Sequence, residues 1–157
     1  MKLKILAIGK TDSSALSELI SEYEKRLKRF VPLELEIIPD VKKSGKLSAT
    51  EQMRKEAEAL LNRVKPGDKI VLLDERGRQY SSLDFAKYLQ QQMNSGIKQL
   101  VFVIGGPYGA DQQLRQRAMD SWSLSKLTFS HQMVRLFAIE QIYRAMTILK
   151  NQPYHHR

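Results

Sequence analysis

The sequence has no cysteine and only three histidines, His131, His155 and His156. The absence of cysteine excludes disulfide scaffolds, thiolate zinc sites, iron–sulfur clusters and cysteine nucleophiles. Because histidines are so few, we also expect no metal site. Long apolar runs are missing too: residues 5–8 are too short for a secretory signal, and no run approaches the roughly 20 residues that span a bilayer. We therefore expect a cytoplasmic protein that does not bind a membrane.

Acidic residues are scarce relative to basic ones. The 157 residues, enough for one domain over 1–157, include 26 Lys and Arg but 17 Asp and Glu, a net charge of +9. Residues 79–157 hold nine basic and only four acidic side chains. This excess makes a polyanion, with nucleic acid as the first candidate, a plausible partner. General solubility is the alternative that charge supports equally well.

Short apolar runs alternate with longer amphipathic segments. We predict strands over residues 3–8, 33–38, 69–74 and 100–104, helices over 13–29, 48–64, 81–96, 111–119 and 132–150, and loops over 41–47 and 75–80. This alternation is typical of an α/β protein with a mainly parallel sheet flanked by helices. Ligands of such sheets bind beyond the carboxyl ends of the strands. Those ends are predicted at Asp74, at Gly105 and near residues 124–129.

Three glycines, Gly105, Gly106 and Gly109, directly follow the predicted strand 100–104. Glycine lets a ligand lie against bare main chain. The spacing does not match a dinucleotide fingerprint, because Pro107 stands where the second glycine belongs, and no phosphate loop motif follows. Pro107 also removes an amide donor. We expect a ligand site that does not cradle phosphate, with a simple strand-to-helix turn as the alternative.

The segment 121–129 mixes serines, a threonine and a lysine with apolar residues. Main-chain groups and hydroxyls beside apolar side chains can hold an adenine edge and a ribose. Read without further information, the segment favours an edge strand with Trp122 in the core.

The last predicted helix carries Glu140 and Arg144, four residues apart and hence neighbours on one helix face. A surface ion pair is the simplest interpretation. His131, just before this helix, is interpreted as an N-terminal cap or a solvent-exposed residue, with catalysis as the less favoured alternative. The tail, residues 153–157, combines an aromatic ring with imidazole and cationic groups, which suits an unpaired base with its phosphate. A frayed terminus is the alternative.

Taken together, these segments resemble one family. The resemblance rests on residues 102–109, 122–129, 131, 135, 140, 143–145 and 153–155, and it extends from the first strand to the tail. The sequence is similar to the small bacterial SPOUT-class methyltransferases, which methylate a ring nitrogen, N3, of a pseudouridine in large-subunit ribosomal RNA. The chain length agrees with that family.

The resemblance implies a fold and a cofactor that composition and periodicity do not reveal. The expected fold is an α/β knot whose C-terminal segment is threaded into a trefoil, a rare exception to the rule against knots. The expected cosubstrate is S-adenosylmethionine, bound without a metal in a homodimer that acts on ribosomal RNA in assembled ribosomes. By position, the cofactor contacts would be Leu73, Gly105, Leu124, Ser125, Lys126, Leu127, Thr128 and Phe129. This reverses the edge-strand interpretation of that segment.

The same resemblance assigns the helix and the tail to the RNA site, with the tail of one subunit completing the site of the other. Arg144 is the candidate for stabilising a ring anion, His155 or Glu140 for the base, and Tyr154 for a further site residue. Here His156 separates the Tyr-His pair from Arg157, so the resemblance leaves open which of the two contacts phosphate. A non-catalytic RNA-binding module of the same fold and a flavodoxin-like anion binder are the rival functions.

Overall fold

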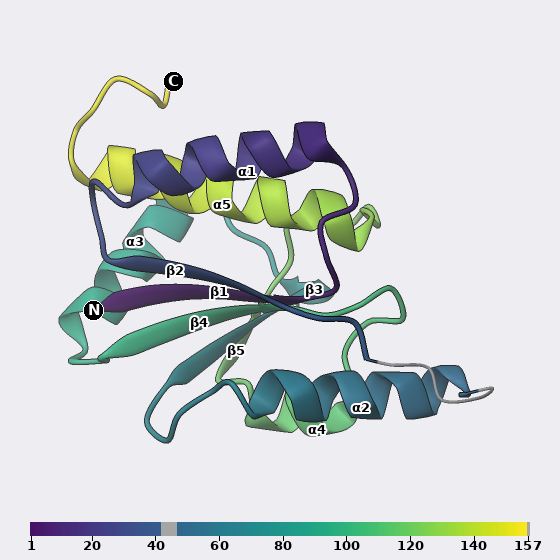
Figure 1. The fold of residues 1–157 in the computed structure, drawn as a ribbon. Helices are drawn as coiled ribbons and strands as arrows, with labels where there is room; N and C mark the ends of the chain where they lie inside the picture. Colours follow the sequence, from purple (N-terminus) through teal and green to yellow (C-terminus); the bar gives the residue numbers. More distant parts are fainter. Residues whose placement is uncertain (42–46, 157) are drawn as a thin grey trace.

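A computed structural model describes residues 1–41 and 47–156 and contains a five-stranded sheet in the order β2-β1-β4-β3-β5 (Figure 1). All four strand pairings are parallel, which confirms the predicted α/β class. The strands are β1 (Lys2–Ile8), β2 (Leu33–Ile38), β3 (Lys69–Arg78), β4 (Gln99–Ile104) and β5 (Asp120–Trp122). The helices are α1 (Ser14–Leu27), α2 (Ala49–Leu61), α3 (Ser82–Asn94), α4 (Gln112–Arg117) and α5 (His131–Leu149). Most of the loop predicted over 41–47 lies outside the described residues.

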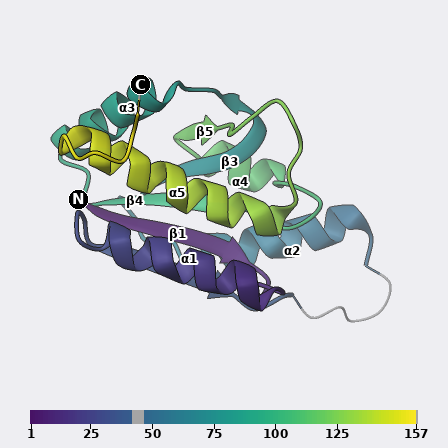
Figure 2. The ribbon, with the colours of Figure 1, turned by 90° about the horizontal axis from the view of Figure 1, so that it is seen from above.

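The two faces of the sheet are covered by different helices. Helices α1, α3 and α5 lie on one face and α2 and α4 on the other (Figures 1 and 2). Strand β1 is buried on both sides and is apolar apart from Lys2 and Lys4: Leu3 and Ile5 belong to the core under α5, and Leu6 and Ile8 to the core over α2. Trp122 is buried, as predicted, and stacks on Phe85 with ring centroids 4.1 Å apart.

Serine side chains mark where the long helices begin. Ser13, Ser48, Ser81 and Ser130 each accept a hydrogen bond through Oγ from a main-chain amide three residues further on, at 3.1 to 3.3 Å. The helix starts predicted near Ser48 and Ser81 are thereby confirmed. The cap predicted for His131 is wrong, because Ser130 caps α5 and His131 is its first helical residue. Within the described part of the chain, no helix is long and apolar enough to cross a membrane.

Strand β3 extends further than the sequence suggested. The charged segment 75–80 was expected to be a loop, but the strand continues to Arg78. Trp122 of β5 pairs with both Leu73 and Arg78, so β3 bulges between these two positions. Gly77 permits this close approach, since a Cβ there would lie 2.7 Å from the Ser121 carbonyl carbon. The charged side chains of this extension sit at the edge of the sheet beside β5.

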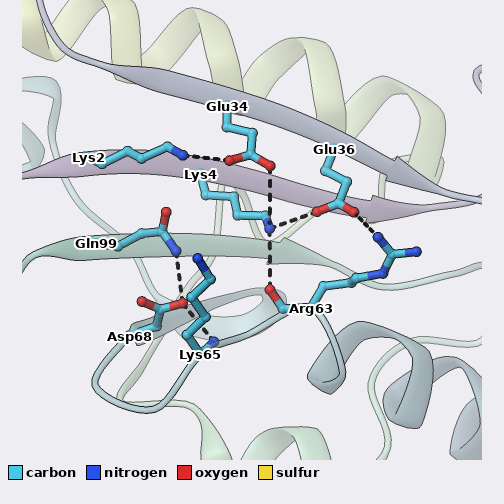
Figure 3. A network of polar contacts seen from close by, with 8 residues as sticks. All are labelled: Lys2, Lys4, Glu34, Glu36, Arg63, Lys65, Asp68 and Gln99. Carbon is cyan, nitrogen blue, oxygen red and sulfur yellow. Dashed lines mark hydrogen bonds and ion pairs between the residues drawn. The ribbon is translucent and has the colours of Figure 1, made fainter.

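A polar network occupies the amino-terminal half of β1 and β2, on the face that α2 covers (Figure 3). Lys4 is buried and lies 2.7 Å from Glu36 and 3.6 Å from Glu34, and its Nζ donates to the Arg63 carbonyl at 3.3 Å. The hydrogen bond from Lys2 outweighs partial burial and holds the pKa of Glu34 below its ordinary value. These ion pairs explain how charged residues are accommodated within paired strands. They lie at the opposite end of β1 from the strand's carboxyl terminus.

Candidate active site

A cavity of about 650 Å³ opens beyond the carboxyl end of β4 and beside residues 73–76 of β3, where the sequence predicted a ligand. It lies between the turn after β4 and the segment that leads from β5 into α5. Seven of the eight predicted cofactor residues line it: Leu73, Gly105, Leu124, Ser125, Leu127, Thr128 and Phe129. Lys126 is exposed and is not among the lining residues. The structure therefore brings together two segments that are about twenty positions apart in the chain.

The glycine turn forms one wall of bare main chain. Gly109 has a positive φ of 88°, and its amide donates to the Gly106 carbonyl at 3.1 Å. A Cβ on Gly106 would lie 2.5 Å from Oε2 of Glu56, a buried residue of α2. Gln52 donates to Glu56 Oε1 at 2.9 Å. Only glycine at position 106 allows the turn to pack this closely on α2, a contact that the sequence analysis missed.

The facing wall is a series of turns held by its own hydroxyls. Ser123 Oγ donates to the Ser125 carbonyl at 2.8 Å, and Ser125 Oγ accepts from the Leu127 amide at 3.0 Å. Thr128 Oγ1 donates to Glu75 of the β3 extension at 2.5 Å. These bonds replace ladder hydrogen bonds, so β5 ends at Trp122. The edge-strand interpretation is right at Trp122 and wrong beyond it.

An ion pair joins Asp74 of β3 to Arg115 of α4, and both residues line the cavity. Arg115 Nε also donates to the carbonyl of Ala110, which follows the glycine turn, at 3.2 Å. Burial raises the pKa of Asp74, but the Arg76 amide and Arg115 outweigh it, so the pKa lies below its ordinary value. No local sequence pattern predicts this pair, because its members are separated by 41 positions.

Replacing Asp74 with asparagine should lower the free energy of unfolding by about 1–2 kcal/mol near pH 7, because Arg115 loses its carboxylate. Since the folded-state pKa lies below the ordinary value of 3.8, the stabilisation is fully present above pH 3.8. It is lost as the pH falls through the lower folded value. Urea unfolding at several pH values should show that the unfolding free energies of wild type and variant converge in acid. A difference in unfolding free energy that stays the same at every pH would contradict the ion-pair explanation.

The candidate RNA residues form a second cluster, the tail cluster, made of Glu140, Arg144, Tyr154 and His155. Glu140 Oε1 accepts from Arg144 Nη2 at 2.7 Å and from the Tyr154 hydroxyl at 2.9 Å. Arg144 Nη1 lies 3.3 Å from His155 Nδ1, and the guanidinium lies 4.8 Å from the centre of the Tyr154 ring. The residues that sequence similarity selected thus contact one another. The expected pairing of Glu140 with Arg144 is confirmed, and Tyr154 and His155 are half-buried rather than frayed.

Comparison with known proteins identifies the family. Residues 1–155 match the family described as "Predicted SPOUT methyltransferase". The chain belongs to the SPOUT methyltransferase family. A protein of Christiangramia forsetii named "Ribosomal RNA large subunit methyltransferase H" is 54% identical over 157 residues and covers 100% of both chains. Proteins of the same name from Flavobacterium psychrophilum and Parabacteroides distasonis are 54% and 51% identical, with 100% and 99% of each chain covered.

In this SPOUT methyltransferase the cavity and the tail cluster lie at opposite ends of α5. His131 and Val134, at the start of the helix, line the cavity, whereas Arg144 comes thirteen residues after His131. At 1.5 Å per residue, these two positions are roughly 20 Å apart along the helix axis. Figure 1 shows the same separation, with the tail leaving the end of α5 opposite to the loops that follow β1 and β4. Within one chain, the two groups of predicted site residues do not meet.

His131, for which the sequence favoured a cap or a solvent-exposed position over catalysis, lines the cavity of this SPOUT methyltransferase. Gln132 fixes the orientation of its ring: Gln132 Oε1 accepts from the Asp12 amide at 3.4 Å, and Nε2 donates to the Lys10 carbonyl at 3.1 Å. The same Nε2 lies 3.3 Å from Nε2 of His131, which must therefore accept. Burial, and next the positive charge of Arg135, lower the pKa of His131. The imidazole is neutral at pH 7 and carries its proton on Nδ1.

Proposed function

We propose that this chain transfers a methyl group from S-adenosylmethionine to N3 of a pseudouridine in the ribosomal RNA of the large subunit. The proposed substrate is the assembled ribosome, because a small domain offers few elements of its own to recognise an RNA sequence. The observation that carries this proposal is the cavity between the glycine turn and the segment ending at Phe129. Its position at the carboxyl edge of the sheet, in a family of methyltransferases, supports a cofactor site.

The lining of the cavity suits an adenosyl group. Its volume of about 650 Å³ is within the range of small-molecule sites. Gly105 would let the ligand lie against bare main chain, Leu124 and Leu127 would contact an adenine, and Ser125 would offer a hydroxyl to the ribose. When bound, S-adenosylmethionine supplies a methyl group on a sulfonium, an activated donor that requires no metal. The work left to the protein is mainly alignment of the two reactants.

We further propose that the active form is a homodimer with composite sites. The cavity of one subunit has no tail cluster within reach, so a second subunit has to supply it. The surface near the cavity carries exposed apolar side chains that a partner would cover, with exposed fractions of 71% for Leu127, 55% for Tyr108, 38% for Met133 and 37% for Phe137. The trefoil knot expected from the family resemblance belongs to this proposal as well.

Mass spectrometry of ribosomal RNA from cells with and without the gene tests the proposed function. One methylated pseudouridine in the large-subunit RNA should be lost completely without the gene and restored by a plasmid copy. In vitro, purified protein should methylate ribosomal particles from the deleted strain much faster than the same RNA freed of protein. An unchanged methylation pattern would contradict the enzyme, and equal rates on both substrates would contradict the ribosome as its substrate.

A non-catalytic RNA-binding module is the second candidate, favoured by the net charge of +9. Isothermal titration calorimetry with S-adenosylmethionine separates it from the enzyme. A pure RNA binder should give no saturable heat, whereas the proposed methyltransferase should bind one molecule of S-adenosylmethionine per cavity.

A further inference from the structure

The donor and the acceptor of each hydrogen bond in the tail cluster can be assigned in only one way. The series of donors begins with Tyr23 of α1. Glu140, paired with Arg144, can only accept, so the Tyr154 hydroxyl donates to it at 2.9 Å. Having used its proton, Tyr154 must accept from the Tyr23 hydroxyl, 3.1 Å away. Burial, the bond with Tyr23 and the bond with Glu140 all raise the pKa of Tyr154, so the phenol keeps its proton. Tyr23, 131 positions away in the chain, thus holds Tyr154 in place.

Glu140 accepts hydrogen bonds on both of its oxygens. Oε1 accepts from both Arg144 and Tyr154, and Oε2 accepts from Gln141 at 2.6 Å. Three of the roughly four lone-pair sites of this carboxylate are thus occupied by donors in the described part of the chain.

His155 is also bound on its basic nitrogen. A guanidinium has donors only, so His155 Nδ1 is the acceptor of the 3.3 Å contact with Arg144 Nη1. The ring is therefore neutral, and its proton is on Nε2. A second proton, on Nδ1, would face the positive charge of Arg144. The half-buried imidazole offers an N–H donor and no lone pair.

We propose that the tail cluster is a set of hydrogen-bond donors that stabilises the ionised pseudouridine ring, with Tyr23 as its positioning residue, and that it does not contain the base. The donors are His155 Nε2–H and the remaining N–H groups of Arg144, aimed at the negative charge that forms on the ring. N3 gives its proton to hydroxide or water. Its lone pair then forms the bond to the methyl carbon, and the electron pair of the broken carbon–sulfur bond stays on sulfur. This inference rests on the proposed function.

Among the described residues, the titratable neighbours that pack against the cluster are Tyr23 and Arg26 of α1 and Tyr143 of α5. His156, an exposed imidazole, follows His155 directly in the chain. If it or His155 were the base, the pH dependence of the rate would reveal it.

The pH dependence of single-turnover methylation of ribosomal particles tests the inference. With solvent as the base, the rate should rise about tenfold per pH unit from pH 6 to 8.5, without a break. A plateau above about pH 6.5 would instead identify an imidazole base and overturn the inference. Wild-type protein that transfers no methyl group at any pH would contradict the proposed function itself, so the two failures are distinguishable.

Two substitutions of His155 separate a donor from a base. Glutamine can place an N–H near the position of Nε2 but has no basic nitrogen, and phenylalanine keeps only the ring shape. His155→Gln should stay within about tenfold of the wild-type rate and keep the same pH slope, while His155→Phe should fall about a hundredfold. Equal losses in both variants would overturn the inference. Independently of activity, nitrogen-15 NMR of the imidazoles should show His155 as the neutral Nε2–H tautomer at pH 7.

Tyr23→Phe tests the positioning role. Removing one hydroxyl should lower the rate about three- to tenfold, leave the affinity for S-adenosylmethionine unchanged and preserve the pH slope. Tyr88→Phe is the matched control, because its buried hydroxyl has no hydrogen-bond partner among the described residues and its ring packs on Tyr80 and Phe85, outside the cluster. A Tyr23→Phe variant with the rate of the Tyr88→Phe control would contradict the positioning role.

Discussion

Replacing Gly106 with alanine should weaken the binding of S-adenosylmethionine about a hundredfold while the protein stays folded. The added methyl would lie 2.5 Å from Oε2 and 2.8 Å from Cδ of Glu56, far inside contact distance. Glu56 is only 4% exposed, so its carboxylate has little room to retreat. The turn would have to move away from α2 and into the cavity. Calorimetric titration with S-adenosylmethionine measures the loss directly.

A second substitution shows whether the clash is the cause. Shortening Glu56 to alanine in the Gly106→Ala background frees the space that the methyl needs and should restore most of the affinity. Gly96→Ala is the control, since a Cβ there meets nothing within 4 Å and the position is remote from the cavity. If Gly106→Ala binds as tightly as Gly96→Ala, the close packing of the turn on α2 does not shape the cofactor site.

Replacing Arg144 with alanine should lower the rate of methyl transfer about a hundred- to a thousandfold. The guanidinium holds Glu140 and His155 together and supplies donors to the developing ring anion. The affinity for S-adenosylmethionine should stay within about threefold of wild type, because no residue of the tail cluster is among those that line the cavity. Single-turnover methylation of ribosomal particles measures the rate, and calorimetry measures the affinity for S-adenosylmethionine.

Arg63→Ala controls for the loss of one positive charge from a basic protein. Arg63 is an exposed arginine of the network in Figure 3, paired with Glu36 at 2.6 Å and far from both parts of the site. The Arg63→Ala variant should methylate ribosomal particles at the wild-type rate. If Arg144→Ala loses cofactor affinity in proportion to its rate, the tail cluster acts through the fold of the cavity and not on the RNA.

The parts of the fold that depend on local sequence could be predicted. Helix starts follow from a serine oxygen that satisfies a free amide three residues on, as at Ser48 and Ser81. Residues 5–8 of β1 and 100–104 of β4 are continuous apolar runs because both faces of these strands are buried. The glycine turn could be placed at the carboxyl edge of the sheet because it follows β4 directly. Resemblance to a family added the segment 124–129, which local pattern alone read as an edge strand.

What could not be predicted depends on contacts between distant positions. The pairs Asp74–Arg115, Glu56–Gly106 and Tyr23–Tyr154 exist only because the sheet order brings their elements together, and no periodicity encodes them. The β3 extension was missed for a related reason, since its charged residues lie beside β5 at the sheet edge. The family resemblance predicted Lys126 as a cofactor contact together with its neighbours in the chain, but its side chain is exposed beside the lining segment. Contact with phosphate by His156 or Arg157 stays a prediction, and Arg157 lies outside the described residues.

The composite site can be tested with one heterodimer. Gly106→Ala and Arg144→Ala subunits carrying different tags are co-expressed, and the mixed dimer is purified through both tags. Each variant alone should be nearly inactive at limiting S-adenosylmethionine. The mixed dimer pairs an intact cavity with an intact tail cluster at one of its two sites, so it should recover about half of the wild-type rate per dimer. A mixed dimer as inactive as its two parents would contradict a site shared between subunits.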